Sequence, residues 1–241
     1  MKRDFKKLRE KYLSKKATKY NFQKWHNLMY QNSRLAEDRK YKMKGLELGC
    51  GVTPMSDIYS DIIPTDIENS PLAEKIVDAI NIPYQNQSFD SIFGLNVFHH
   101  ISDKKKFLQE AKRVLTKEGT IVLLEPSYSL FSRVIYPHLF NTEYYDTSES
   151  FDNLNTYDPM EDANQAASYI LFVKNKEIFL KDSGFTIQKI VYCKNAFSFL
   201  LSGGLNFTQL APFFIIKTLM NASRPFKIFS LHWIIVLRKI D

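Results

Sequence analysis

Cysteine is scarce in this sequence, since Cys50 and Cys193 are the only two among 241 residues. Two thiols cannot build the disulfide framework of a small secreted domain, and without a CxxC pair they do not indicate a zinc site, so we expect no metal ligands. The first residues are basic but lack the apolar core and the small-residue cleavage site of a secretory signal. These absences predict a cytoplasmic protein.

Charged side chains are absent between Asn195 and Ile216. An uncharged stretch of this length raises the question of a membrane span. Several of its residues are polar, however, and Gly203-Gly204 and Pro212 would interrupt a spanning helix. We expect a buried or interfacial lid instead.

Positive charge is concentrated at the start of the chain. Residues 1–44 hold fifteen Lys or Arg and four Asp or Glu, a local net charge of +11, so the remainder of this +7 chain is net −4. The simplest interpretation is a solvated amphipathic helix. The functional interpretation is an arm that meets phosphates, and we expect it to touch a membrane surface peripherally rather than to bind nucleic acid.

The composition is that of one elaborated domain, because 44% hydrophobic residues in a chain of this length can bury one substantial core. No glycine or proline precedes Gly45, and Phe22, Trp25 and Met29 recur at helical spacing. The sequence therefore predicts a basic helical segment over residues 1–44, followed by the main domain over 45–241.

From Gly45 onward, short apolar runs alternate with helical patterns. This alternation indicates an α/β fold, with a mostly parallel sheet between layers of helices. Helices are expected from Lys104 to Leu115 and from about Ser168 to Asp182. The predicted strands are 46–48, 61–66, 88–95, 120–125, 186–192 and 232–238, the last two as an antiparallel pair at one end of the sheet.

Two segments, 126–167 and 195–228, are too long to be ordinary loops. Each follows a predicted strand, so we expect both to lie over the carboxyl edge of the sheet, where open α/β folds bind their ligands. They are expected to form a lid over the substrate.

A turn with two glycines follows the first predicted strand, in the run Glu47-Leu48-Gly49-Cys50-Gly51. Such a turn lets a ligand approach the backbone closely. Asp66 ends the second predicted strand, where a carboxylate can accept the ribose hydroxyls of an adenosine. The lysine of a Walker loop is absent and Pro54-Met55 replaces the third glycine of the dinucleotide fingerprint, so a phosphate ligand is disfavoured.

Over residues 43–126 the sequence resembles the class I S-adenosylmethionine-dependent methyltransferases, in particular the type 11-like group with quinone and other small-molecule methyltransferases. The resemblance implies a Rossmann-like fold with a mostly parallel seven-stranded sheet and an antiparallel late strand. It implies S-adenosyl-L-methionine as cofactor and S-adenosyl-L-homocysteine as product. The runs that carry it are 45–51, 65–66, 78–90, 96–101 and 110–120.

The resemblance also implies a role for each matching position, although Ala79 and Val97 can equally be packing residues. The methionine portion is assigned to Glu47, Gly49 and Gly51, with Cys50 in the same loop, and the ribose to Asp66. The adenine is assigned to Ile67, Asp78 and Ala79, and the neighbourhood of the sulfonium to Asn96 and Val97.

Methyl transfer is a displacement at a carbon that the sulfonium already activates, so catalysis can come from holding the acceptor in line. A hydroxyl acceptor also benefits from a base, and histidine suits that task near neutral pH. His99 and His100 follow the strand expected at 88–95, and Glu125 ends the next one. We take these three as candidate catalytic residues; the alternative is packing for the histidines and a loop cap for Glu125.

The insertion 126–167 contains seven acidic residues against Arg133 alone, so it is poorly suited to a polyanion. Its aromatic side chains suit a neutral, sugar-like, lipid or cationic acceptor, although a plain aromatic core explains many of them equally well. These aromatic residues are Tyr128, Phe131, Tyr136, Phe140, Tyr144, Tyr145, Phe151 and Tyr157.

A narrower resemblance is to bacterial methyltransferases with surface-polysaccharide or envelope functions, and it implies a glycan or lipid-linked acceptor. It is carried by residues 125–129, 158–166 and 200–205. We therefore expect a methyltransferase whose acceptor is a small molecule, a glycan or a lipid-linked compound.

Two other functions remain open. One is an RNA methyltransferase that uses the basic start as a clamp, although no Asn/Asp-Pro-Pro-Tyr/Phe segment is present. The other is a noncatalytic cofactor-binding protein at the membrane surface. The intact set Glu47, Gly49, Gly51 and Asp66 weighs against the second alternative.

Overall fold

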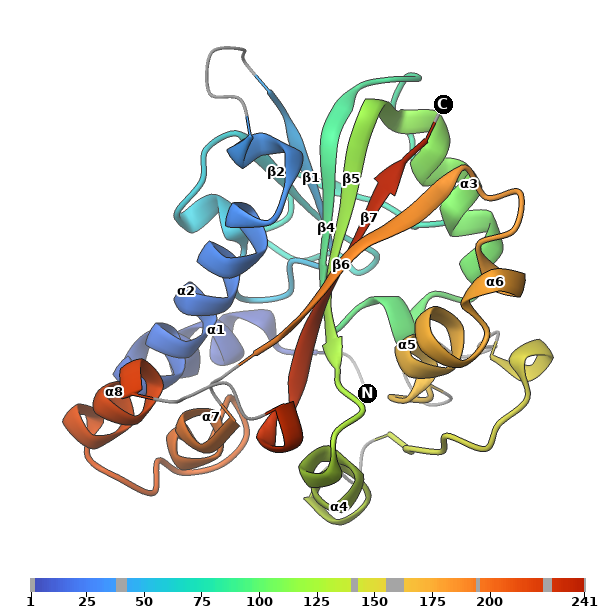
Figure 1. Ribbon diagram of the computed structural model, residues 1–241. Helices are drawn as coiled ribbons and strands as arrows, with labels where there is room; N and C mark the ends of the chain where they lie inside the picture. The colour runs from blue at the N-terminus through green and yellow to red at the C-terminus, as the bar shows by residue number, and fades with distance from the viewer. Residues whose placement is uncertain are drawn as a thin grey trace.

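A computed structural model describes residues 3–37, 43–139, 143–154, 163–193, 196–222 and 227–240. A seven-stranded sheet runs through the centre of the molecule, with helices on both of its faces (Figure 1). The strands, in their order across the sheet, are β3 (Lys75–Ile76), β2 (Ile62–Asp66), β1 (Gly45–Leu48), β4 (Phe89–Leu95), β5 (Leu115–Pro126), β7 (His232–Lys239) and β6 (Phe185–Tyr192).

Neighbouring strands from β3 to β5 run parallel, and β7 runs antiparallel to both β5 and β6. This topology confirms the predicted α/β fold with a mostly parallel seven-stranded sheet and an antiparallel late strand. All four residues of β1 are buried, as expected for a central strand that helices cover on both faces.

Helices α1, α2, α7 and α8 cover one face of the sheet, and α3, α5 and α6 cover the other (Figure 1). The longer helices are α1 (Phe5–Ser14), α2 (Lys16–Gln31), α3 (Lys104–Val114), α4 (Leu130–Leu139), α7 (Ala196–Ser202) and α8 (Phe213–Ala222). The single-turn elements are η1 (Arg34–Ala36), η2 (Met55–Asp57), η3 (Phe98–His100), η4 (Phe151–Asn153) and η6 (Lys227–Phe229). No helix among the described residues is long and apolar enough to cross a membrane.

The helix expected from Ser168 to Asp182 is not continuous, so that prediction was wrong. It consists of α5 (Ala167–Tyr169), the π-helical turn η5 (Ile170–Lys174) and α6 (Lys176–Phe179). The interruption is caused by Asn175, whose backbone N–H and side-chain Nδ2 both donate to the carbonyl of Ile170, at 2.9 and 3.0 Å. An asparagine side chain that bonds the backbone in this way competes with the regular helical pattern.

Two strands differ from the predicted ones. β5 begins at Leu115 rather than at residue 120, because Leu115 already pairs with Phe89 of β4 before the register shifts between Phe89 and Ser91. The short edge strand β3 was not predicted, since its two residues are exposed and carry no alternating pattern.

The helical start of the chain closes one face of the sheet. Trp25 and Met29 of α2 are 2% and 0% exposed, and they belong to the same core cluster as Val122 of β5 and Ile234 of β7. The segment is helical as its pattern predicted, and its apolar residues at helical spacing dock α2 on the sheet.

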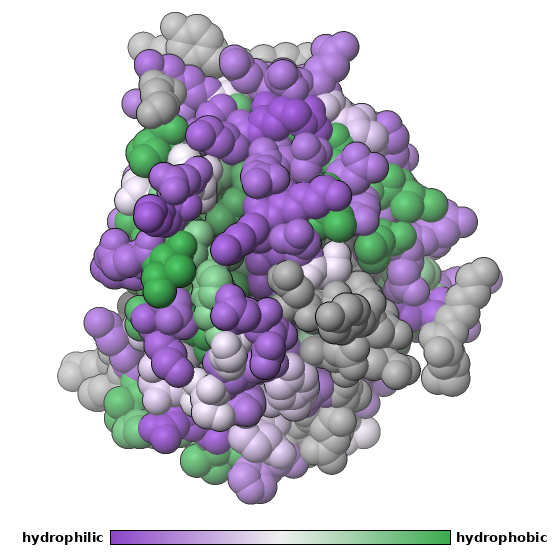
Figure 2. Space-filling view, turned by 90° about the vertical axis from the view of Figure 1, so that its right-hand side faces the viewer, coloured by the Kyte–Doolittle hydropathy of each residue, from purple (hydrophilic) through white to green (hydrophobic). Residues whose placement is uncertain are grey.

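The opposite face is covered by α3, which begins at its N-cap Asp103, where the side chain accepts a hydrogen bond from the N–H of Lys106 at 2.9 Å. Its apolar side, including Phe107 and Ala111, is buried on the sheet. Figure 2 looks onto this side of the molecule and shows a mainly hydrophilic surface with scattered apolar side chains.

Candidate cofactor site and histidine–glutamate cluster

A cavity of about 430 Å³ lies at the carboxyl edge of the sheet, beside the ends of β1, β2 and β4. All ten positions implied by the family resemblance line it: Glu47, Gly49, Cys50, Gly51, Asp66, Ile67, Asp78, Ala79, Asn96 and Val97. The remaining lining residues include Arg3, Phe5, Leu8 and Phe22 from the start of the chain. They also include Leu205 and Asn206 from the segment 195–228, the late insertion. The fold thus brings every implied position to one cavity.

The glycine turn after β1 needs its glycines for two different reasons. Gly49 has φ +68°, and a Cβ there would lie 2.4 Å from Cγ2 of Val97. Gly51 has φ +52° and open space where its Cβ would be. Left-handed backbone favours glycine at both positions, and the second one leaves the cavity side of the loop bare for a ligand.

Asp66 ties the end of β2 to this turn. Its Oδ2 accepts a hydrogen bond from the N–H of Gly51 at 2.8 Å, and its Oδ1 accepts one from the N–H of Glu68 at 3.0 Å. The side chain of Ser70 donates to the carbonyl of Gly51 at 2.9 Å. The carboxylate is therefore held in place at the cavity wall.

Glu47 is almost fully buried, and its Oε2 accepts a hydrogen bond from the N–H of Met55 at 2.8 Å. Burial raises the pKa of Glu47 to about 8. Burial likewise raises the pKa of the Cys50 thiol to about 12, so the thiol at this wall of the cavity is neutral near pH 7.

Asn96 lines the cavity and is unusual in both its backbone conformation and its side chain. It has φ +52°, and its N–H donates to the carbonyl of Leu124 at 2.7 Å. Its Oδ1 is buried and has no hydrogen-bond partner among the described residues. A buried acceptor without a donor is costly, which indicates a ligand group that donates to it.

The positions expected to lie near the adenine have a more open setting. Ile67 is 52% exposed, and Asp78 turns its Oδ1 to the N–H of Ile80 at 3.0 Å. Ala79 packs at the edge of the apolar core as well as lining the cavity. These residues form a partly apolar slot that suits a flat heterocycle.

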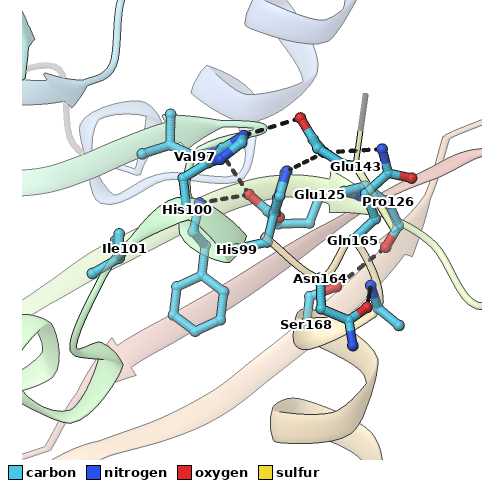
Figure 3. Close-up of polar contacts among 12 residues, drawn as sticks. Val97, His99, His100, Ile101, Glu125, Pro126, Glu143, Asn164, Gln165 and Ser168 are labelled. Atoms are coloured by element: carbon cyan, nitrogen blue, oxygen red, sulfur yellow. Dashed lines mark hydrogen bonds and ion pairs between the residues drawn. The ribbon is translucent and has the colours of Figure 1, made fainter. Parts of the chain in front are cut away.

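Of the three candidate catalytic residues, two are buried beside the cavity and one lines it. Glu125 is 0% exposed, and its Oε1 accepts hydrogen bonds from the N–H groups of Val97 and Phe98 at 3.0 and 2.9 Å (Figure 3). Its Oε2 lies 2.5 Å from Nδ1 of His99, which is 2% exposed. This carboxylate caps the turn η3 and orients His99.

His100 lines the cavity, and both histidines contact the carboxylate of Glu143 through Nε2 (Figure 3). Nε2 of His99 lies 3.2 Å from Oε2 of Glu143, and Nε2 of His100 lies 3.4 Å from Oε1. Burial lowers the pKa of His99, but Glu125 and Glu143 outweigh it and raise this pKa to about 9. Burial opposes ionisation of Glu143, yet the two histidines hold its pKa far below the usual range.

Sequence reasoning missed Glu143, which lies in the insertion 126–167. Leu205 and Asn206 place the other insertion, 195–228, over the cavity. The described part of 126–167 does not line the cavity directly and reaches it through the contact of Glu143 with His100. Phe140, Tyr157 and most of the motif at 158–166 lie outside the described residues.

Two lysines fasten the start of the chain to the late insertion above the cavity. Nζ of Lys15, at the corner between α1 and α2, donates to the carbonyl of Gly204 at 3.0 Å. Nζ of Lys11 donates to the carbonyl of Asn206 at 3.3 Å. The two segments that cover the cavity are thus joined to each other.

Comparison with known proteins agrees with this geometry. Residues 46–123 match the family profile described as a methyltransferase domain. The demethylmenaquinone methyltransferase of Thermotoga maritima is 37% identical over 68 residues, which cover 27% of this chain and 30% of that enzyme. The chain thus spans less than a third of that relative's length.

Two solved structures share the fold of nearly the whole chain. A Thermotoga maritima methyltransferase described as a possible histamine N-methyltransferase has a TM-score of 0.50 and 13% identity, over 91% of this chain and 95% of its own. Haemonchus contortus phosphoethanolamine N-methyltransferase 2, solved with S-adenosylhomocysteine, has a TM-score of 0.51 and 14% identity, over 90% of this chain and 52% of its own. This chain therefore contains a methyltransferase domain in the fold of the class I S-adenosylmethionine-dependent methyltransferases.

Proposed function

We propose that this chain is an S-adenosylmethionine-dependent methyltransferase whose acceptor is a lipid-linked compound at a membrane surface. The observation that carries the cofactor assignment is the cavity itself, where ten implied binding positions from four separate stretches of sequence converge. The sulfonium of the bound cofactor would supply an activated methyl group.

The residues of the cavity fit the chemistry of that cofactor. Asp66 offers a fixed carboxylate to the ribose hydroxyls, and the bare backbone at Gly51 allows close approach of the methionine portion. The orphaned Oδ1 of Asn96 can accept a hydrogen bond from the ammonium group of the cofactor. These residues bind and orient, which is the main requirement for a displacement at an activated carbon.

A lipid-linked acceptor is supported by the apolar surface of α4, α7, α8 and η6. Leu210 is 70% exposed and Phe214 is 69% exposed, and both follow the stretch whose Leu205 and Asn206 line the cavity. Other large apolar side chains exposed on these elements are Leu130, Val134, Phe197, Ile215, Leu219, Ile228 and Phe229. An apolar surface of this extent marks an interaction site.

Positive charge accompanies this apolar surface. Lys217 of α8 and Lys16 at the start of α2 are exposed, and α2 packs against α8. Apolar side chains flanked by lysines suit the interface of a bilayer that contains anionic lipids. These exposed apolar and basic residues, near the segment whose Leu205 and Asn206 line the cavity, support a membrane-bound acceptor.

The cofactor assignment is tested by calorimetric titration of the purified chain with S-adenosyl-L-homocysteine, with Asp66→Ala as the variant that should lose affinity. A folded chain that does not bind would overturn the proposal. The acceptor is tested by incubating the chain with radiolabelled S-adenosyl-L-methionine and a cell extract separated into lipid, glycan, RNA and small-molecule pools. Label in the lipid pool supports the proposed acceptor, and label confined to another pool contradicts it.

A further inference from the structure

Two adjacent histidines and one glutamate converge at the wall of the cavity in the way that metal ligands do. Each of the three offers one ligand atom, a ring nitrogen or a carboxylate oxygen, and these atoms all lie within 4.8 Å of one another (Figure 3). Nε2 of His99 lies 3.2 Å from Oε2 of Glu143, and Nε2 of His100 lies 3.4 Å from Oε1 of the same carboxylate. Ligand atoms bound at about 2.0–2.2 Å to a tetrahedral zinc ion lie roughly 3.3–3.5 Å apart, so little movement is needed to bind one.

The support behind these three side chains is that of a metal site. Glu125 holds Nδ1 of His99, which leaves Nε2 directed at Glu143. Nε2 of Gln165 donates to Oε2 of Glu143 at 2.9 Å. A carboxylate that orients a histidine from behind, and a hydrogen bond that orients the carboxylate ligand, are the usual outer partners of metal ligands.

An ion pair between one histidine and Glu143 would explain only part of this arrangement. One protonated imidazole would be enough to pair with Glu143, yet two imidazole nitrogens from consecutive residues meet the same carboxylate. Glu125 and Glu143 together also bring two negative charges to a largely buried place. A divalent cation bound by neutral imidazoles would balance both of them.

We propose that His99, His100 and Glu143 bind a zinc ion, with an open coordination position on the cavity side. Two histidines and one glutamate are a known ligand set of catalytic zinc, whose remaining position is left to water or substrate. Because His100 also lines the cavity, that position lies beside the space assigned to the cofactor. This site could not be predicted from the sequence, because Glu143 lies 44 positions after His99.

The role of the ion rests on the proposed methyl transfer. A hydroxyl of the acceptor would occupy the open position, where the cation lowers the pKa of that hydroxyl. Its O–H bond breaks, the proton passes to water, and the electron pair stays on an oxygen that the cation stabilises. The electron pair of that oxygen would then form the new bond to the methyl carbon while the C–S bond of the sulfonium breaks, its electron pair goes to sulfur and S-adenosyl-L-homocysteine leaves, so no histidine has to act as the base.

The site is tested with the full chain, stripped of metal by a chelator and titrated with Zn²⁺ in a calorimeter, and with Co²⁺ as a spectroscopic probe of coordination number. We expect one ion per chain. Glu143→Gln and His100→Ala should each weaken zinc binding at least tenfold, and Glu125→Gln by about 10–100-fold. Glu143 and His100 are partly exposed, with side chains 18% and 20% accessible, so their variants should fold.

Matched controls are Glu177→Gln and His138→Ala, because both side chains are exposed and lie outside the cluster. Zinc binding should be unchanged in these two variants. Absence of zinc binding by the parent chain, or equal binding by Glu143→Gln, overturns the site. Methyl transfer that continues undiminished in chelator overturns the catalytic role of the ion. A chain that binds zinc but neither binds S-adenosyl-L-homocysteine nor transfers methyl groups contradicts the proposed function and leaves the metal site standing.

Discussion

The carboxylate of Asp66 is held by the backbone N–H of Gly51, across a separation of fifteen residues and a distance of 2.8 Å. This contact fixes the glycine turn relative to the carboxylate that we propose binds the ribose. Asp66→Ala removes both the carboxylate and this contact, so we expect affinity for S-adenosyl-L-homocysteine to fall about 10–100-fold, the value of one or two charged hydrogen bonds. Calorimetry measures it, and Glu177→Ala, at an 87% exposed side chain, should bind like the parent chain.

Gly49→Ala should destabilise the chain and abolish cofactor binding. The new methyl group would lie 2.4 Å from Cγ2 of Val97, on a residue with φ +68°. Val97→Ala in the same chain removes the clashing atom, so the double variant should recover much of the lost stability, leaving about 1–2 kcal/mol of backbone strain. Denaturant unfolding of both variants decides this, and a double variant no more stable than Gly49→Ala would show that the clash with Val97 is not the cause.

Glu47 should make the fold less stable as the pH rises from about 4.5 to about 8. Burial raises the pKa of Glu47 to about 8, so the folded chain keeps a proton that the unfolded chain has already lost in this interval. Glu47→Gln cannot lose that proton. The free energy of unfolding of this variant, relative to the parent chain, should therefore rise with pH across the interval by a few kcal/mol. A constant difference between the two chains would contradict the assignment.

Trp25→Ala should destabilise the chain by about 3–5 kcal/mol, because the side chain is 2% exposed in the core between α2 and the sheet. Leu13→Ala, at a side chain that is 48% exposed, should change stability by less than about 0.5 kcal/mol. Unfolding midpoints in urea compare the two. If α2 were only loosely attached, the two substitutions would have similar, small effects.

Leu210→Glu combined with Phe214→Glu should weaken binding to vesicles that contain anionic lipid. These are the two most exposed large apolar side chains of the late insertion. The control is Ile178→Glu, at a 61% exposed residue of α6 on the other side of the sheet. Co-sedimentation with vesicles gives the bound fraction. Equal binding by the double variant and the control would rule out this surface as the contact with the membrane.

The convergence of the implied cofactor-binding positions at one cavity was predictable because most of them follow predicted strands. Gly49 and Gly51 follow β1, Asp66 ends β2 and Asn96 follows β4, and parallel strands bring their carboxyl ends to one edge. Each residue could therefore be recognised from its place after a strand. The alternation of short apolar runs with helical patterns likewise predicted the mostly parallel sheet.

The parts that could not be predicted depend on contacts between distant segments. Glu143 lies 44 residues from His99, and no periodicity tells where an insertion returns to the sheet. Phe5 and Leu8 cover the cavity because α1 folds back over it, which their own helical pattern does not specify. The π-helical turn before Asn175 depends on the side chain of Asn175, which donates a hydrogen bond to the carbonyl of Ile170 instead of to solvent.

The bonds from Lys11 and Lys15 to the segment 204–206 have a consequence for the timing of catalysis. The helix α1 and this segment both line the cavity, and because the lysines join them we expect them to move together when a ligand enters or leaves. Opening of such a cover is often slower than the chemical step. We expect the departure of S-adenosyl-L-homocysteine to limit turnover, and contact of the neighbouring α8 with a membrane to change how fast it departs.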